Sequence, residues 1–83
     1  MITIITKNYC PYCHSAKAFL ESLGKKYQEI EVSSDPEIYQ KYKDISWMNT
    51  VPQIFDGEAT YENLIGWNDD MMQKYRAGEI FQD

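Results

Sequence analysis

Two cysteines, Cys10 and Cys13, lie close to the start of the chain and are separated by a proline and a tyrosine. They follow a run of mainly β-branched residues at 2–6, and Pro11 suits the first turn of a helix, where its missing N–H costs nothing. A strand that leads into such a helix places Cys10 beside unpaired backbone N–H groups and the positive end of the helix dipole. Because both features stabilise a thiolate, the pattern predicts a nucleophilic Cys10, with Lys7 close upstream, and a more buried Cys13 within disulfide reach.

The reaction that this pair predicts is thiol–disulfide exchange, in which Cys10 attacks a substrate disulfide and Cys13 then displaces the product. A structural disulfide or a metal clip is the alternative interpretation of the same spacing. Zinc usually takes about four nitrogen or sulfur ligands, and a helix would point the neighbouring His14 away from the two thiols. The position of the pair between a strand and a helix therefore favours redox chemistry, and no metal site is predicted.

Composition narrows the remaining classes of protein. With 83 residues, 43% of them hydrophobic, the chain is expected to form a single domain, 1–83, around one small core. Its net charge of −5 comes from an excess of acids in 44–83, which argues against nucleic acid and anionic membranes as partners. No stretch approaches the roughly 20 apolar residues of a membrane span, and the first residues lack a signal-peptide pattern. A monomer in the reducing cytoplasm is the resulting expectation.

Hydrophobic periodicity and turn residues predict the element order β-α-β-α-β-β-α. The expected strands are 2–6, 27–32, a short run that begins after Pro52, and part of 60–65. The expected helices begin at Cys10, at Ser34 or Asp35, and at Asn68–Asp70, and they end near Gly24, Asp44 and Gly78. The apolar residues that the second and third helices should bury are Ile38, Tyr42 and Ile45, and Met71, Met72 and Tyr75.

Three segments, 6–17, 50–55 and 65–70, together resemble a dithiol glutaredoxin. They carry the Cys-Pro-Tyr-Cys motif, the run Thr-Val-Pro-Gln-Ile-Phe, and Ile-Gly followed by Asn-Asp-Asp. The resemblance implies an α/β, thioredoxin-like fold with a small mixed four-stranded sheet flanked by three helices. It also implies a glutathione-dependent oxidoreductase that reduces protein disulfides and glutathione mixed disulfides, with glutathione as co-substrate and no tightly bound cofactor.

The resemblance further implies a glutathione site beside Cys10. Its residues would be Lys7, Tyr12, Thr50, Val51, Pro52, Gly66, Asn68 and Asp69. Val51 would pair with the tripeptide through its backbone next to a cis Pro52, and Asn68 and Asp69 would hold the γ-glutamyl end. The sequence departs from the family where Gly66 is followed by Trp67 instead of a second glycine, and where 56–65 is longer than the usual hairpin.

Two other functions are compatible with the same motif. One is a redoxin that is recharged by thioredoxin reductase, a hypothesis suggested by the change at Gly66-Trp67. For this redoxin, as for a glutathione-dependent enzyme, ribonucleotide reductase is a plausible electron acceptor by family analogy only. The other is an iron–sulfur carrier in which Cys10 of two chains and two glutathiones hold one cluster.

Overall fold

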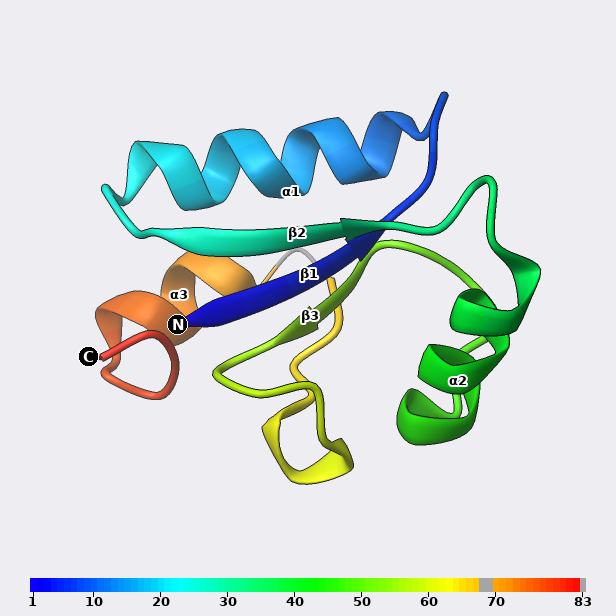
Figure 1. The fold of residues 1–83 in the computed structure, drawn as a ribbon. Helices are drawn as coiled ribbons and strands as arrows, with labels where there is room; N and C mark the ends of the chain where they lie inside the picture. The colour runs from blue at the N-terminus through cyan, green and yellow to red at the C-terminus, as the bar shows by residue number, and fades with distance from the viewer. Residues whose placement is uncertain (68–69, 83) are drawn as a thin grey trace.

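The computed structural model describes residues 1–67 and 70–82 and forms a small sheet with helices on both of its faces (Figure 1). The elements in chain order are β1 (Ile2–Thr6), α1 (Pro11–Ser22), β2 (Tyr27–Glu31), α2 (Pro36–Ser46), β3 (Gln53–Phe55), the 3₁₀ helix η1 (Tyr61–Asn63) and α3 (Met71–Arg76). No helix in this part of the chain is long and apolar enough to cross a membrane.

β1 is the central strand of the sheet, whose order is β2-β1-β3. All five of its residues are buried, which explains why the segment is almost continuously apolar instead of alternating. β2 runs parallel to β1 because the two strands are joined through α1, and its register pairs Ile5 with Ile30. β3 runs antiparallel on the other side, with Ile4 opposite Ile54 and Ile5 opposite Gln53.

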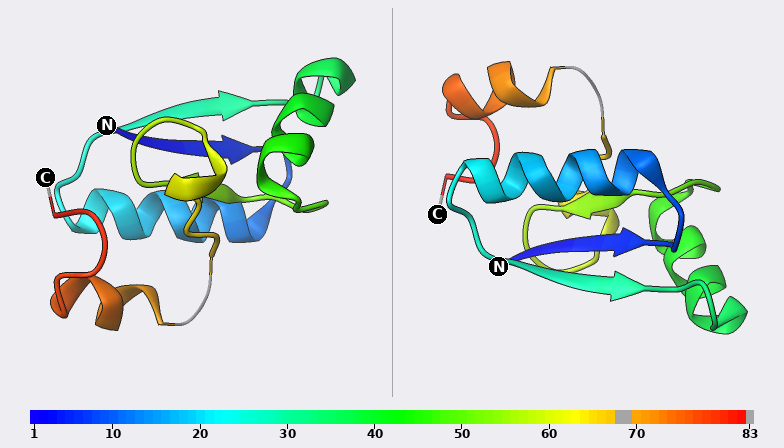
Figure 2. Two further views of the ribbon diagram at one scale, coloured as in Figure 1. Left: turned by 90° about the horizontal axis from the view of Figure 1, so that it is seen from below. Right: turned by 90° about the horizontal axis from the view of Figure 1, so that it is seen from above.

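The two faces of the sheet carry different helices, which lie on opposite sides of the strands in Figure 2. One face packs against α1 and α3, and its buried apolar residues are Ile2, Ile4, Ala16, Leu20, Ile54, Met71, Ile80 and Phe81. The other face packs against α2 and the 56–65 segment, and its buried apolar residues are Ile5, Val32 and Phe55. This layered α/β arrangement with a mixed sheet is the thioredoxin-like fold that the sequence predicts.

The fourth strand expected within 60–65 is not formed in the described chain. A short helix, η1, lies there instead, and only one antiparallel bridge joins Phe55 to Leu64. The side-chain amide of Asn63 donates to the carbonyl of Glu58 at 3.0 Å, which folds the segment back on itself. These local hydrogen bonds compete with extended pairing along β3, so the sheet has three strands and not four.

Two details of α2 differ from expectation. Asp35 is the cap, because its Oδ1 accepts the backbone N–H of Ile38 at 3.1 Å, but the helix continues past Asp44 to Ser46. The expected burial of Ile38 is wrong, since this side chain is 41% exposed. The half-buried residues that pack on the sheet are Tyr39, Tyr42 and Ile45. The apolar face of α2 is therefore rotated by one residue from Ile38 to Tyr39.

Candidate active site

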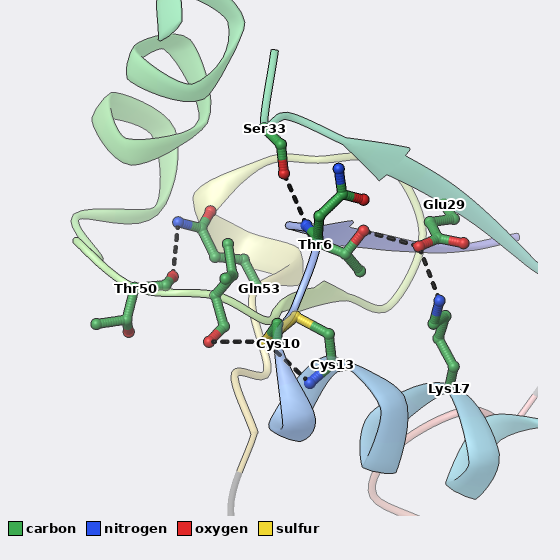
Figure 3. Close-up of a disulfide and its surroundings, with 10 residues drawn as sticks. Thr6, Cys10, Cys13, Lys17, Glu29, Ser33, Thr50 and Gln53 are labelled. Atoms are coloured by element: carbon green, nitrogen blue, oxygen red, sulfur yellow. Dashed lines mark hydrogen bonds and ion pairs between the residues drawn. A yellow bond between two sulfur atoms is a disulfide. The ribbon is translucent and has the colours of Figure 1, made fainter. Parts of the chain in front are cut away.

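Cys10 is the N-cap residue of α1, so its sulfur belongs to the first turn of the helix (Figure 3). The backbone N–H of Cys13 donates to Cys10 Sγ at 3.1 Å, and the N–H of His14 donates to the Cys10 carbonyl at 3.2 Å. The two cysteines form a disulfide, with their Cα atoms 5.2 Å apart. An N–H group aimed at Cys10 Sγ stabilises negative charge there once the disulfide is reduced.

The two sulfurs differ in their exposure to solvent. Cys13 lies in the first turn of α1 and is 2% exposed, whereas Cys10, which precedes the helix, is half-buried. A substrate can therefore reach Cys10 Sγ from solvent but not Cys13 Sγ. This geometry permits attack by Cys10 on an external disulfide, followed by attack by Cys13 on the Cys10 sulfur.

The loop that precedes β3 forms the second wall of the site. The carbonyl oxygen of Val51 lies 4.0 Å from Cys10 Sγ, and the Val51–Pro52 peptide bond is cis, as the resemblance implies. Beside it a groove of about 360 Å³ opens, and its lining residues are Tyr12, Met48, Thr50, Val51, Pro52 and Trp67. Four of the predicted site residues thus lie together along one groove next to the reactive sulfur.

The other residues of the predicted glutathione site are placed differently. The ammonium of Lys7 lies 4.0 Å from the centroid of the Tyr39 ring, and Lys43 approaches the same ring at 4.6 Å. Lys7 is not among the residues that line the groove, and neither is Gly66, which has a positive φ of 77°. Asn68 and Asp69 lie outside the described residues. Lys7 and Lys43 together put two positive charges on α2 and the loop before Cys10.

Comparison with known sequences assigns the chain to a family. A family model described as Glutaredoxin matches residues 2–59. The chain belongs to the glutaredoxin family. It is 35% identical over 79 residues to the glutaredoxin of Pseudomonas aeruginosa, which covers 95% of this chain and 89% of that protein. Glutaredoxin 3 of Escherichia coli is 43% identical over 54 residues, which covers 65% of each chain.

Solved structures of glutaredoxins have the same fold. The buckwheat glutaredoxin–glutathione complex superposes with a TM-score of 0.72 at 30% identity, over 94% of this chain and 70% of that one. The glutaredoxin of Brucella melitensis gives a TM-score of 0.71 at 36% identity, over 94% of this chain and 80% of that one. As a member of this family with a cysteine pair at disulfide distance, the protein is a thiol–disulfide oxidoreductase.

Charged side chains of this glutaredoxin tie the active-site helix to the sheet. Glu29 on β2 accepts hydrogen bonds from Thr6 at 2.8 Å and from Lys17 on α1 at 3.0 Å. Partial burial raises the pKa of Glu29, but the bonds from Thr6 and Lys17 outweigh it and hold the pKa below its ordinary value. The ion pair therefore joins the middle of α1 to β2.

The segment between β1 and Cys10 is held by a second polar contact. The backbone N–H of Asn8 donates to Ser33 Oγ at 2.7 Å, and the N–H of Ser33 donates to Glu31 at 2.7 Å. Hydrogen bonds from Ser33 hold the pKa of the Glu31 carboxyl below its ordinary value.

Among the described residues, no group of three or more histidine, cysteine or acidic side chains is arranged to hold a metal ion.

Sequence reasoning singled out Trp67 as a departure from the family but missed three other residues around the groove. Met48 and Trp67 line it, and Trp67 also packs edge-on against Phe19 with ring centroids 5.8 Å apart. Tyr39 and Gln53 hold the loop before β3 from behind. Gln53 had a signal in the sequence, because it is the one polar residue inside the apolar run 51–55 and such a residue is buried only where it has hydrogen-bond partners.

Proposed function

We propose that this glutaredoxin uses glutathione to reduce glutathione mixed disulfides and protein disulfides, with Cys10 as the nucleophile. The observation that supports the proposal is the position of Cys10 Sγ, which is 4.0 Å from the Val51 carbonyl at the edge of an open groove. A groove of about 360 Å³ has room for part of a tripeptide in extended form. An extended backbone there can pair with the Val51 backbone in the manner of an added strand.

In the reduction of a mixed disulfide, the Cys10 thiolate attacks the glutathione sulfur. A bond forms between Cys10 and glutathione, the bond between glutathione and the substrate protein breaks, and the substrate leaves as a thiolate that takes a proton from water. The thiolate of a second glutathione then attacks the bound glutathione sulfur. This step releases oxidised glutathione and returns Cys10 to the thiolate that the N–H of Cys13 stabilises.

In the reduction of a protein disulfide, Cys10 first forms a mixed disulfide with one substrate cysteine, and the other leaves as a thiol. Cys13 then loses its proton and attacks the Cys10 sulfur, so the Cys10–Cys13 bond forms and the first substrate cysteine is released. Two glutathiones reduce that bond and leave as oxidised glutathione. Burial of Cys13 suits this role, because it protects the second thiol from solvent until Cys10 carries a substrate.

The glutathione molecule would extend along the groove from Cys10. We place its cysteine against Val51 and Tyr12, and its glycine carboxylate near the two ammonium groups that flank Tyr39, those of Lys7 and Lys43. Asn68 and Asp69, after Gly66, are the residues proposed for the γ-glutamyl end, on the basis of the family pattern. Thr50 and Pro52, which line the groove beside Val51, would contact the middle of the tripeptide.

A recharge by thioredoxin reductase is the second candidate, and the indole of Trp67 in the groove favours it because this side chain narrows the space for glutathione. The deciding assay follows NADPH oxidation with a glutathionylated peptide, once with glutathione and glutathione reductase and once with thioredoxin reductase. We expect turnover only with glutathione. Turnover only with thioredoxin reductase would overturn the proposal and would show that this enzyme supplies the reducing electrons.

Two serine variants test the division of labour between the cysteines. Cys10→Ser should reduce turnover of both substrate classes to below about 1% of the wild type, because the attacking thiolate is gone. Cys13→Ser should retain reduction of the glutathionylated peptide and lose reduction of a protein disulfide. Equal loss of both activities in Cys13→Ser would contradict the two-step scheme.

A further inference from the structure

The loop before β3 is held by side chains at three consecutive carbonyl groups. The Nε2 of Gln53 donates to the carbonyl of Met48 at 3.3 Å and to the carbonyl of Thr50 at 3.2 Å. The hydroxyl of Tyr39 donates to the carbonyl between them, that of Asn49, at 2.9 Å. The loop thus has little freedom to rotate its peptide groups, although its residues lie at the surface.

Gln53 occupies an unusual place for an amide side chain. It is 0% exposed and lies on β3 opposite Ile5 of the central strand. Both of its partners are carbonyl oxygens, which can only accept, so the nitrogen of the amide must face the loop. The Oε1 of Gln53 is buried and has no hydrogen-bond partner in the described part of the chain. A buried acceptor without a partner costs free energy. The two hydrogen bonds that Nε2 donates to the loop are therefore what Gln53 contributes at this position.

The carbonyl groups that Gln53 holds are adjacent in the chain to the residue that contacts the reacting sulfur. Thr50, one of the two acceptors, directly precedes Val51, and the Val51 carbonyl lies 4.0 Å from Cys10 Sγ. Figure 3 shows the Gln53 side chain extended to Thr50 on the side of the loop opposite the cysteines. If the donor is removed, the carbonyls of Met48 and Thr50 gain by turning toward water, and this rotation moves Val51 relative to Cys10.

We propose that Gln53 is a positioning residue for the exchange reaction, because its amide holds the loop that presents a substrate disulfide to Cys10. The residue acts by donating to the loop from behind, and it does not touch the sulfur itself. For glutathione mixed disulfides this inference rests on the proposed function. The chemical requirement is a buried donor at position 53, so a side chain of equal size without one should fail.

The test compares Gln53→Met with the wild type in single-turnover reactions between the reduced protein and a glutathionylated peptide at increasing concentration. Met keeps the length of the side chain and removes both donors. We expect the half-saturating concentration to rise about tenfold, the effect of losing buried donors to two loop carbonyls. The rate at which iodoacetamide alkylates Cys10 should remain unchanged, because this small reagent needs the thiolate and not the loop.

Three further variants make the comparison specific. Gln28→Met introduces the same chemical change at an exposed position of β2. It should leave both the half-saturating peptide concentration and the alkylation rate of Cys10 at the wild-type value. Gln53→Leu serves in place of the methionine variant if that protein fails to fold, as judged by circular dichroism and a urea titration. Tyr39→Phe removes only the bond to the Asn49 carbonyl and should give a smaller rise, below about threefold.

The outcomes separate this inference from the proposed function. If the wild-type reaction does not saturate with the glutathionylated peptide, the proposed function fails. If the wild type saturates and folded Gln53→Met saturates at the same concentration, the role of Gln53 is wrong and the proposed function stands. If alkylation of Cys10 and exchange slow down together in Gln53→Met, the effect is on the fold or the thiolate, and the positioning role is also overturned.

Discussion

The two faces of the sheet are closed in different ways. Under α1 and α3 the closure is apolar, with Ile4, Leu20 and Ile54 at 0% exposure. Under α2 the buried apolar set is small, and polar groups complete the closure: the Tyr39 hydroxyl on Asn49, and the Gln53 amide on Met48 and Thr50. One face is thus stabilised mainly by close apolar packing, and the other depends also on side-chain hydrogen bonds.

The active site combines elements from both sides of the sheet. Cys10 belongs to α1 and takes its position from the apolar side, whereas the loop that ends in Val51 takes its position from the polar side. Apolar packing tolerates little movement without loss of contacts, while a hydrogen-bonded loop can change its partners. The arrangement therefore fixes the reactive sulfur firmly and leaves substrate placement to a small number of polar contacts.

The largest expected effect is on the apolar face. Leu20→Ala should lower the free energy of unfolding by about 3–5 kcal/mol, because the side chain is 0% exposed and leaves a cavity under α1. Ile45→Ala on α2, where the side chain is half-buried, should lower it by about 1–2 kcal/mol. Urea denaturation followed by circular dichroism measures both values, and equal losses would remove the distinction between the faces.

A smaller effect is expected at the start of α2. Asp35→Ala removes the acceptor for the N–H of Ile38 and should cost about 1 kcal/mol of unfolding free energy. Because the cap belongs to the polar face, alkylation of Cys10 by iodoacetamide should proceed at the wild-type rate. Asp35→Asn, which retains a capping oxygen, is the matched control. A change in the alkylation rate would show that the two faces are coupled.

The smallest effect concerns the polar exception on the apolar face, the contact of Glu29 with Thr6 and Lys17. Since the pKa of Glu29 is lowered in the folded state, its contribution is present at neutral pH and is lost as pH falls through that lowered pKa, below the ordinary value of 4.5. The contribution is at most about 1 kcal/mol, because the pair is partly exposed. Urea midpoints at neutral and acidic pH should differ less in Glu29→Gln than in the wild type.

A matched substitution keeps that measurement specific. Glu62→Gln alters an exposed glutamate in η1 and should retain the full difference between neutral and acidic pH. If Glu29→Gln retains it as well, the carboxylates responsible for acid sensitivity lie elsewhere, and the contact between α1 and β2 adds nothing to stability.

The apolar face is also the part that the sequence predicts best. The Cys-Pro-Tyr-Cys helix start, the periodic residues Ala16 and Leu20, and the helix end before Gly24 are set by local rules of capping and periodicity. The start of β3 after Pro52 follows equally from the missing N–H of proline. These features depend on residues that are neighbours in the chain, so a single sequence contains the information.

The polar face required information from distant residues. Whether Ile38 or Tyr39 faces the sheet depends on a rotation of α2 that the tertiary contacts decide, and the position of Lys7 over Tyr39 joins residues that are far apart in the chain. The 3₁₀ turn that replaces the fourth strand depends on the bond between Asn63 and Glu58, which pattern rules do not reveal. The partners of Gln53 could be recognised only in three dimensions.

The missing fourth strand has a consequence for crowded solutions. β3 is three residues long, and on its outer side Phe55 already forms a bridge with Leu64. This edge therefore offers a neighbouring chain almost no template for pairing. The opposite edge, β2, carries the exposed Glu31, whose charge opposes the approach of an identical strand. Both borders of the sheet therefore discourage edge-to-edge aggregation, even though the protein has a sheet too small to protect itself by closure.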